Sequence, residues 1–270
     1  MLDVLKYIFL GLLQGLTEVL PISSSAHLLI ASSILGLSDD SMFFEVLLHV
    51  ASLIAVCYFM RKRLLELIKG FFKFIFKKDK DYIFEFKYVM MIIVSTLIVV
   101  IFTVLTKDLI DKVTSKLFIV GILLMCNGLL LFYLSKSRGT RNSRQMNFKD
   151  AIVIGLFECL GVFPGISRSG SCLCGAFSRK LDKDTAADYA FMLFIPACLG
   201  ALALELFKIN ELVIETSTIY LYLISFIVTI ISTYYAFKLF LKVIKTKKLS
   251  IFSIYTLILG LLVFLLNILK

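Results

Sequence analysis

Long apolar stretches, separated by short polar segments, dominate the chain. Six uninterrupted runs are each long enough to cross a bilayer as a helix, which takes roughly 17 to 25 residues. They lie at 43–60, 88–106, 116–134, 187–207, 217–238 and 251–269. The pattern predicts an all-α, polytopic helical membrane protein with six full spans, forming a single transmembrane domain over residues 1–270.

Two further runs, 4–38 and 151–178, are apolar but interrupted, and they resemble each other. Each carries a glycine-led motif, then a proline, then serines. These features are Gly11-Leu-Leu-Gln-Gly-Leu16, Pro21 and Ser23-Ser-Ser25 in the first run, and Gly155-Leu-Phe-Glu-Cys-Leu160, Pro164 and Ser167-Arg-Ser169 in the second. A proline breaks a helix, and serine hydroxyls such as those of Ser23, Ser24 or Ser167 can cap the next one. We expect a broken helix in each run and two structural halves, 1–134 and 151–270.

The basic residues predict the orientation of these halves. Four loops hold 22 of the 29 lysines and arginines: nine in 61–87, five in 136–149, three in 179–183 and five in 238–248. Such clusters gather on the cytoplasmic side of a membrane. All four loops share that side only if 4–38 enters and leaves from outside, and 151–178 from inside.

Because each interrupted run would enter and leave the membrane on one side, the sequence predicts two reentrant helical hairpins. They would lie within inverted-topology repeats joined by a basic cytoplasmic linker at 135–150. The alternative is that both interrupted runs are ordinary spans with a proline kink and serines hydrogen-bonded to their own helix. That alternative leaves unexplained three ionisable residues at membrane depth: Glu18, His27 and Arg168. Such residues are costly in a membrane and mark functional sites.

Composition supports the membrane assignment and narrows the chemistry. The chain is 60% apolar and only 18% charged, with a mean hydropathy of +0.96, far from a soluble domain. Its N-terminus lacks the basic start and uniform apolar core of a signal peptide. Six cysteines form no CxxC pair, which argues against redox or metal use. The net charge of +10 lies in loops without a nucleic-acid motif, so membrane lipids are expected as surroundings and nucleic acid is not expected as a partner.

Two helix N-termini that meet inside a membrane would form an anion site, because their free N–H groups and positive dipole ends point to one place. Arg168 adds a planar fork that matches phosphate oxygens. His27 could attack a phosphate directly, or Ser24 after losing its proton, with Glu18 as base, orienting group or metal ligand. Each of these groups also has a structural alternative as a buried partner, and His49 is interpreted as a packing residue.

At these residues the chain resembles the undecaprenyl-diphosphate phosphatase family, known for bacitracin resistance. The stretch Gln14-Gly-Leu-Thr-Glu-Val-Leu-Pro-Ile-Ser-Ser-Ser-Ala-His27 is similar to the family's [E/Q]xxxE motif with its serine-rich turn and histidine. Pro164-Gly-Ile-Ser-Arg-Ser-Gly170 is similar to its PGxSRSG motif. Length and span pattern agree along nearly the whole chain.

The resemblance implies a multi-pass hydrolase of the bacterial plasma membrane. Its substrate would be a C55 polyprenyl diphosphate lipid, cut to undecaprenyl phosphate and inorganic phosphate, which recycles the lipid carrier of peptidoglycan synthesis. It further implies an active site facing the outside, two reentrant hairpins and a divalent cation, Mg or Ca. A homodimer is compatible with this interpretation.

Carried over residue by residue, the resemblance assigns catalysis to Glu18, Ser24 and His27 and a cation to Gln14 and Glu18. Substrate binding would fall to Gln14, Ser23, Ser25, Gly165, Ser167, Arg168, Ser169 and Gly170. Four positions depart from the family pattern: Gln14 is the neutral option of its motif, Ala26 replaces a glycine, Glu158 stands where glutamine is common, and Thr256 follows Tyr255 where an arginine is often seen. The rival from another class is a secondary transporter or lipid flippase, because inverted repeats with broken helices are typical of alternating access.

Overall fold

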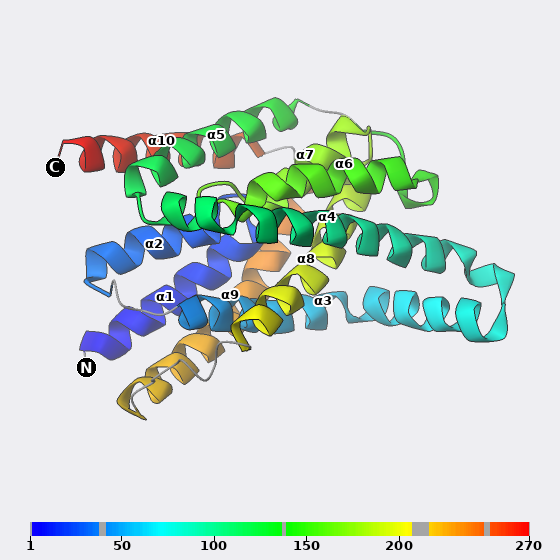
Figure 1. Ribbon diagram of the computed structural model, residues 1–270, viewed down its shortest axis with the longest axis horizontal. Coiled ribbons are helices and arrows are strands. Elements are labelled where there is room, and N and C mark those ends of the chain that lie inside the picture. The colour runs from blue at the N-terminus through cyan, green and yellow to red at the C-terminus, as the bar shows by residue number, and fades with distance from the viewer. Residues whose placement is uncertain (1, 38–41, 137–138, 207–215, 246–248, 270) are drawn as a thin grey trace.

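The computed structural model describes residues 2–37, 42–136, 139–206, 216–245 and 249–269, and these ranges are almost entirely helical (Figure 1). The helices are α1 (Leu2–Val19), α2 (Ser24–Leu35), α3 (Met42–Lys77), α4 (Ile83–Thr114), α5 (Leu117–Ser135), α6 (Phe148–Glu158), α7 (Arg168–Ser178), α8 (Lys183–Leu206), α9 (Thr216–Lys245) and α10 (Leu249–Ile268). Three short 3₁₀ turns lie at Lys80–Tyr82, Ser143–Gln145 and Cys159–Val162.

Six of the described helices, α3, α4, α5, α8, α9 and α10, are long and apolar enough to cross a membrane. This confirms the all-α class and the six predicted spans, except that residue 207, the last of one predicted run, lies outside the described residues. Helix α3 has 36 residues, about 54 Å at 1.5 Å per residue, whereas the hydrocarbon core is about 30 Å thick. The α3–α4 hairpin therefore projects beyond the other helices at one end of the molecule (Figure 1).

Each interrupted run forms two helices that double back. In the first, Val4 near the start of α1 packs in the same apolar cluster as Leu35 and Leu37 at the end of α2. In the second, Asp150 in the first turn of α6 accepts a hydrogen bond from Arg179 at the end of α7. The outer ends of the two pairs lie at opposite ends of the molecule in Figure 1.

Asp150 ties the linker after α5 to the second helix pair. Its fully buried carboxylate accepts hydrogen bonds from Nη2 of Arg141 and Nε of Arg179, each at 2.7 Å, and from the backbone N–H of Asn147 at 2.9 Å. Burial alone would raise the pKa of Asp150, but these hydrogen bonds outweigh burial and hold the pKa below its usual value. The ion pairs fix where α6 begins and where α7 ends.

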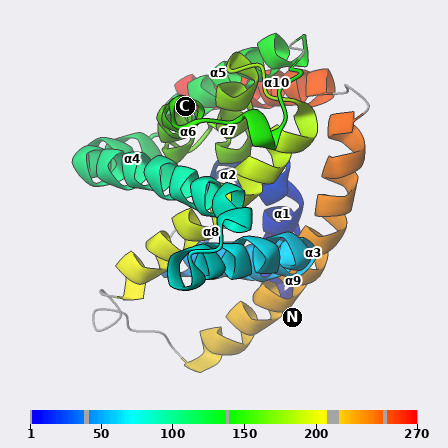
Figure 2. The same cartoon turned by 90° about the vertical axis from the view of Figure 1, so that its right-hand side faces the viewer.

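Small residues let the remaining helices pack closely around the two pairs. Helix α1 contacts α9, where Ser225 and Thr229 donate hydrogen bonds to the Tyr7 and Gly11 carbonyls at 2.7 and 3.0 Å. Helices α5 and α10 lie side by side in both ribbon views (Figures 1 and 2). There, a Cβ added to Gly121 would meet the Gly260 carbonyl oxygen at 2.8 Å. Such close contacts between small residues are typical of membrane helices.

Candidate active site

The two helix breaks meet inside the bundle. Ser23 Oγ accepts a hydrogen bond from the Gly165 N–H at 3.0 Å. Asn127 of α5 joins the same two breaks, because it donates to the Pro21 carbonyl at 3.0 Å and accepts from the Ser167 N–H at 3.1 Å. All three bonds are buried, so segments about 140 residues apart are held tip to tip.

Both breaks use unusual backbone conformations. Ser23 has φ 70° and Gly165 has φ 111°, in the region that favours glycine. A strained non-glycine residue such as Ser23 persists only where its surroundings enforce it. Ser167 caps α7 by accepting from the Gly170 N–H at 3.2 Å, as the sequence predicts. Ser23 forms no such cap for α2, because its hydroxyl goes to Gly165 instead, so that part of the capping prediction is wrong.

Glu18 lies at the centre of the site, with a side chain only 4% exposed. Its Oε1 accepts from Nη2 of Arg168 at 3.0 Å. Its Oε2 accepts from Ser24 Oγ at 2.5 Å and from Gln14 Nε2 at 2.8 Å. Four residues singled out from the two motifs are thus brought together, and the buried carboxylate is balanced by a guanidinium from the other helix pair.

His27 is held by both ring nitrogens. Its Nδ1 donates to the Ser23 carbonyl at 2.7 Å, since a carbonyl can only accept. Its Nε2 then accepts from the Tyr255 hydroxyl of α10 at 2.7 Å, and the two rings stack at 5.6 Å. Neither bond reaches Glu18 or the nucleophile candidate Ser24. Tyr255 has no signal in the two motifs, which lie more than eighty residues before it.

His49 of α3 belongs to the site, so its interpretation as a packing residue is wrong. Its Nε2 lies 3.3 Å from Glu18 Oε2, and its Nδ1 donates to the Glu45 carbonyl at 2.8 Å. His49 therefore contacts the carboxylate at Oε2, the oxygen that does not bind Arg168.

The pair formed by Glu18 and Arg168 lines two cavities, which we name by their linings. The reaction chamber is lined by Glu18, Ser23, Ser24, Ser25, Gly161, Ile166, Ser167 and Arg168. The inner chamber is lined by Glu18, Val19, Val56, Glu158, Arg168, Ser169, Cys172, Ala190, Phe191 and Phe194. Four of the motif serines thus line the first cavity, while Ser169 lines the second, which is largely apolar.

The remaining predicted residues shape these walls. Ser169 Oγ lies 3.1 Å from Ser167 Oγ, within hydrogen-bond distance. The N–H groups of Gly165 and Gly170 both donate to serine hydroxyls, and Gly165 lies so close to α5 that an added Cβ would meet the Val120 carbonyl oxygen at 2.8 Å. The two glycines therefore form the breaks themselves.

The fit of a divalent cation depends on the oxygen atoms near Glu18. Gln14 Oε1 is buried without a partner in the described residues, so it is a free acceptor next to the carboxylate. Within the same residues, no three His, Cys, Asp or Glu side chains lie close enough to hold a metal ion. One amide oxygen and one carboxylate suit a cation such as Mg²⁺, which usually keeps waters and takes substrate phosphate oxygens as its other ligands.

Comparison with known proteins matches the sequence of the chain to one family. The family model described as "Bacitracin resistance protein BacA" matches residues 7–262. "Undecaprenyl-diphosphatase 3" of Bacillus anthracis is 37% identical over 259 residues, covering 96% of both chains. "Undecaprenyl-diphosphatase 1" of Bacillus cereus is 37% identical over 260 residues, with the same coverage. "Undecaprenyl-diphosphatase" of Methanosphaera stadtmanae is 36% identical over 278 residues, covering 99% of both chains.

Proposed function

The chain belongs to the family of the bacitracin resistance protein BacA, and from the geometry of its two helix breaks we propose how it acts as an undecaprenyl-diphosphatase. It is a hydrolase that cuts undecaprenyl diphosphate to undecaprenyl phosphate and inorganic phosphate. One observation supports the assignment of its site above all others. A serine hydroxyl, a buried carboxylate and an arginine from the opposite helix pair form one hydrogen-bonded chain, Ser24–Glu18–Arg168.

Ser24 is the nucleophile of the proposed reaction, and Glu18 is its base. Ser24 Oγ already donates to Glu18 Oε2 at 2.5 Å, so the proton has a place to go. Oγ attacks the terminal phosphorus, the bond from phosphorus to the bridging oxygen breaks, and undecaprenyl phosphate leaves. Water then attacks the phosphorus of the phosphoserine and the bond from phosphorus to Ser24 Oγ breaks. Oγ takes back the proton held by Glu18, and inorganic phosphate leaves with the oxygen of the water, whose second proton passes to solvent.

Arg168 neutralises the phosphate and aligns Glu18. One of its nitrogens holds Glu18 Oε1, which leaves other N–H donors for phosphoryl oxygens. The first turns of α2 and α7 add backbone N–H groups that lack partners within the helix. Phosphoryl transfer depends mainly on such positioning and charge neutralisation.

His27 acts as a positioning residue in this proposal. Both of its ring nitrogens are engaged, one with the strained Ser23 backbone and the other with Tyr255. It therefore fixes the turn that presents Ser24, whereas direct attack on phosphorus would require Nε2 to leave Tyr255. Trapping the phosphoenzyme and testing its stability in acid distinguishes the two candidate nucleophiles, Ser24 and His27.

A divalent cation remains part of the proposal through Gln14 and Glu18. Gln14 Oε1 is the free acceptor, and Glu18 is the adjacent carboxylate. When bound, the cation would neutralise charge on the diphosphate oxygens. Gln14 also keeps Glu18 in place by donating to Oε2.

We further propose that the two broken helix pairs are reentrant hairpins of inverted repeats, with the reaction chamber open to the outside of a bacterial cell membrane. Support comes from the outer ends of the pairs, which lie at opposite ends of the molecule (Figure 1). The segment between α5 and α6 and the α3–α4 turn, both basic, share the end that is predicted to be cytoplasmic.

Single cysteines test this orientation, in a background where the six native cysteines are replaced. From the sequence, position 141 is predicted to be cytoplasmic and position 213 external. However, Arg141 forms an ion pair with Asp150, and 213 lies outside the described residues. Exposed Lys149, in the first turn of α6, and exposed Lys116, between α4 and α5, are better sites. We expect a membrane-impermeant thiol reagent to label Lys116→Cys in intact cells and Lys149→Cys only after lysis. The reverse pattern would refute the orientation.

Phosphate release in detergent tests the function against the rival, a secondary transporter or flippase. We expect purified protein to release inorganic phosphate from undecaprenyl or farnesyl diphosphate, because hydrolysis needs no sealed compartment whereas transport does. A preparation that moves lipid phosphates across vesicles but never releases phosphate would support the rival.

A further inference from the structure

Glu158 is a buried acid that the proposed reaction does not use. It is the last residue of α6 and is 2% exposed, and its Oε2 has no hydrogen-bond partner in the described part of the chain. Cys172, one turn beyond Arg168 on α7, lines the same cavity as this carboxyl group. One oxygen of the acid therefore remains available.

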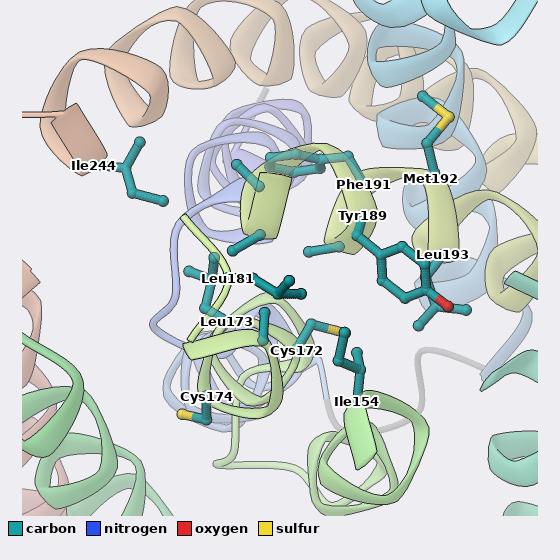
Figure 3. Close-up of a cluster of buried hydrophobic side chains, with 14 of the residues drawn as sticks. Ile154, Cys172, Leu173, Cys174, Leu181, Tyr189, Phe191, Met192, Leu193 and Ile244 are labelled. Atoms are coloured by element: carbon teal, nitrogen blue, oxygen red, sulfur yellow. The ribbon is translucent and has the colours of Figure 1, made fainter. Parts of the chain in front are cut away.

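Glu158 lines the inner chamber together with Glu18, Arg168 and Ser169, while the other lining residues are mostly apolar. Cys172 is part of this lining, and it lies near Ile154 of α6 and Leu173 among buried apolar side chains (Figure 3). The polar part of the lining thus comes from the first turn of α7 and from the ends of α1 and α6.

The surroundings favour the neutral acid form of Glu158. A carboxylate with one unsatisfied oxygen among valine and phenylalanine side chains would be a poorly compensated buried charge. Arg168 lies within electrostatic reach, but its hydrogen bond goes to Glu18. In the neutral acid, the O–H group at the unpartnered Oε2 is free to donate into the chamber. Enzymes do keep buried carboxylic acids neutral as hydrogen-bond donors.

We propose that the inner chamber is a second phosphate subsite, in which Glu158, Ser169 and Arg168 donate hydrogen bonds to phosphoryl oxygens. The N-terminus of α7 favours an anion there, and Glu158 is the unpartnered buried donor that makes the site more than a helix end. The inference rests on the proposed function, since hydrolysis of a diphosphate brings the phosphate to Arg168. Two sources share this chemistry: released inorganic phosphate and the lipid's second phosphate group.

Two substitutions of Glu158 test the subsite in the full-length protein. Glu158→Ala removes the donor, and Glu158→Gln keeps a neutral donor of similar size. For Ala we expect either the inhibition constant of inorganic phosphate or the KM for farnesyl diphosphate to rise at least about ten-fold, the usual effect of losing a hydrogen bond to a charged group. A rise in the first alone assigns the subsite to released phosphate, and a rise in the second assigns it to the lipid. Glu158→Gln should stay within about three-fold of the parent in both.

The results distinguish a failure of the phosphate subsite from a failure of the proposed function. If Glu158→Ala leaves both constants unchanged, or Glu158→Gln is as damaging as Ala, the subsite is refuted while hydrolysis by the parent still supports the proposed function. If the parent releases no phosphate, the proposed function itself fails. Glu66→Ala, on the exposed cytoplasmic extension of α3, is the control for substitution of a glutamate, with both constants expected at the parent's values.

The pH profile supplies a readout that a purely structural role would not change. Alkaline pH should ionise Glu158 in the parent and weaken phosphate binding, whereas Glu158→Gln should keep its affinity further into the alkaline range. The titratable or charged groups that face Glu158 are Arg168 and Cys172 from α7, Glu18 from α1, Tyr189 from α8 and the adjacent Cys159. Both proteins keep these groups, so the difference between their profiles isolates Glu158. Superimposable profiles would refute the neutral-acid assignment.

Discussion

Replacing Ser24 by alanine should lower kcat for undecaprenyl diphosphate by at least about 10⁴-fold, the scale seen when a serine nucleophile is removed from a hydrolase. The physical reason is the loss of the attacking oxygen, which in the parent donates its proton to Glu18. KM should change little, because Arg168 and the helix N-termini still hold the diphosphate. The measurement is steady-state phosphate release by detergent-purified protein.

Ser33→Ala is the matched control, because Ser33 lies on the same helix but is exposed. It should retain the kcat of the parent. Rapid acid quenching of the parent with labelled substrate should trap a phosphoenzyme that survives acid, since phosphoserine is acid-stable and phosphohistidine is not. Trapping should fail in Ser24→Ala. An adduct that survives an alkaline quench but not acid, persists in Ser24→Ala and disappears in His27→Ala would instead make His27 the nucleophile.

Much of the architecture follows from local features of the sequence. The six spans can be predicted because each is a continuous apolar run. In hydrocarbon, such a run must form a helix so that every backbone polar group is hydrogen-bonded. The two breaks can be predicted because in each a proline is followed within a few residues by serines that can start a new helix, whereas Pro196, without such serines, stays inside α8. The convergence of Glu18 with Arg168 follows from placing two such breaks in one membrane, and the structure joins these side chains at 3.0 Å.

The supporting residues could not be predicted in the same way. His49, Asn127 and Tyr255 lie on α3, α5 and α10, inside ordinary apolar helices, and no local motif surrounds them. Their roles depend on which helix faces pack against the breaks, which in turn depends on close contacts such as that between Gly121 and Gly260. A polar residue in an apolar span signals a buried partner, but the sequence alone does not name that partner.

The Ser23 hydroxyl illustrates a second limit. Its position before α2 predicts a cap, because serine is among the best N-terminal capping residues. In the structure, the φ of 70° turns the residue away from the capping geometry, and the hydroxyl accepts from Gly165 N–H of the other half. A long-range contact therefore replaced the local one, and it is this contact that joins the two halves at the reaction chamber.

Arg168→Lys should lower kcat/KM for undecaprenyl diphosphate by about 10²- to 10³-fold, the range for removing one preorganised donor from a reacting anion. Lysine keeps the positive charge, but it lacks the planar fork that can hold Glu18 Oε1 and phosphoryl oxygens together. Arg168→Ala is less informative, since it would strand a carboxylate that is 4% exposed and cost about 3 to 5 kcal/mol of stability.

Arg179→Lys provides the matched control for Arg168→Lys, since Arg179 lies at the opposite end of α7 and contacts Asp150 rather than the chambers. It should retain the parent's kcat/KM, with at most a lower melting temperature in detergent. Because phosphate binding requires the fork and not only the charge, Arg168→Lys should also raise the inhibition constant for inorganic phosphate. If Arg168→Lys instead hydrolyses within about three-fold of the parent, a simple positive charge is sufficient and the bidentate role of Arg168 is wrong.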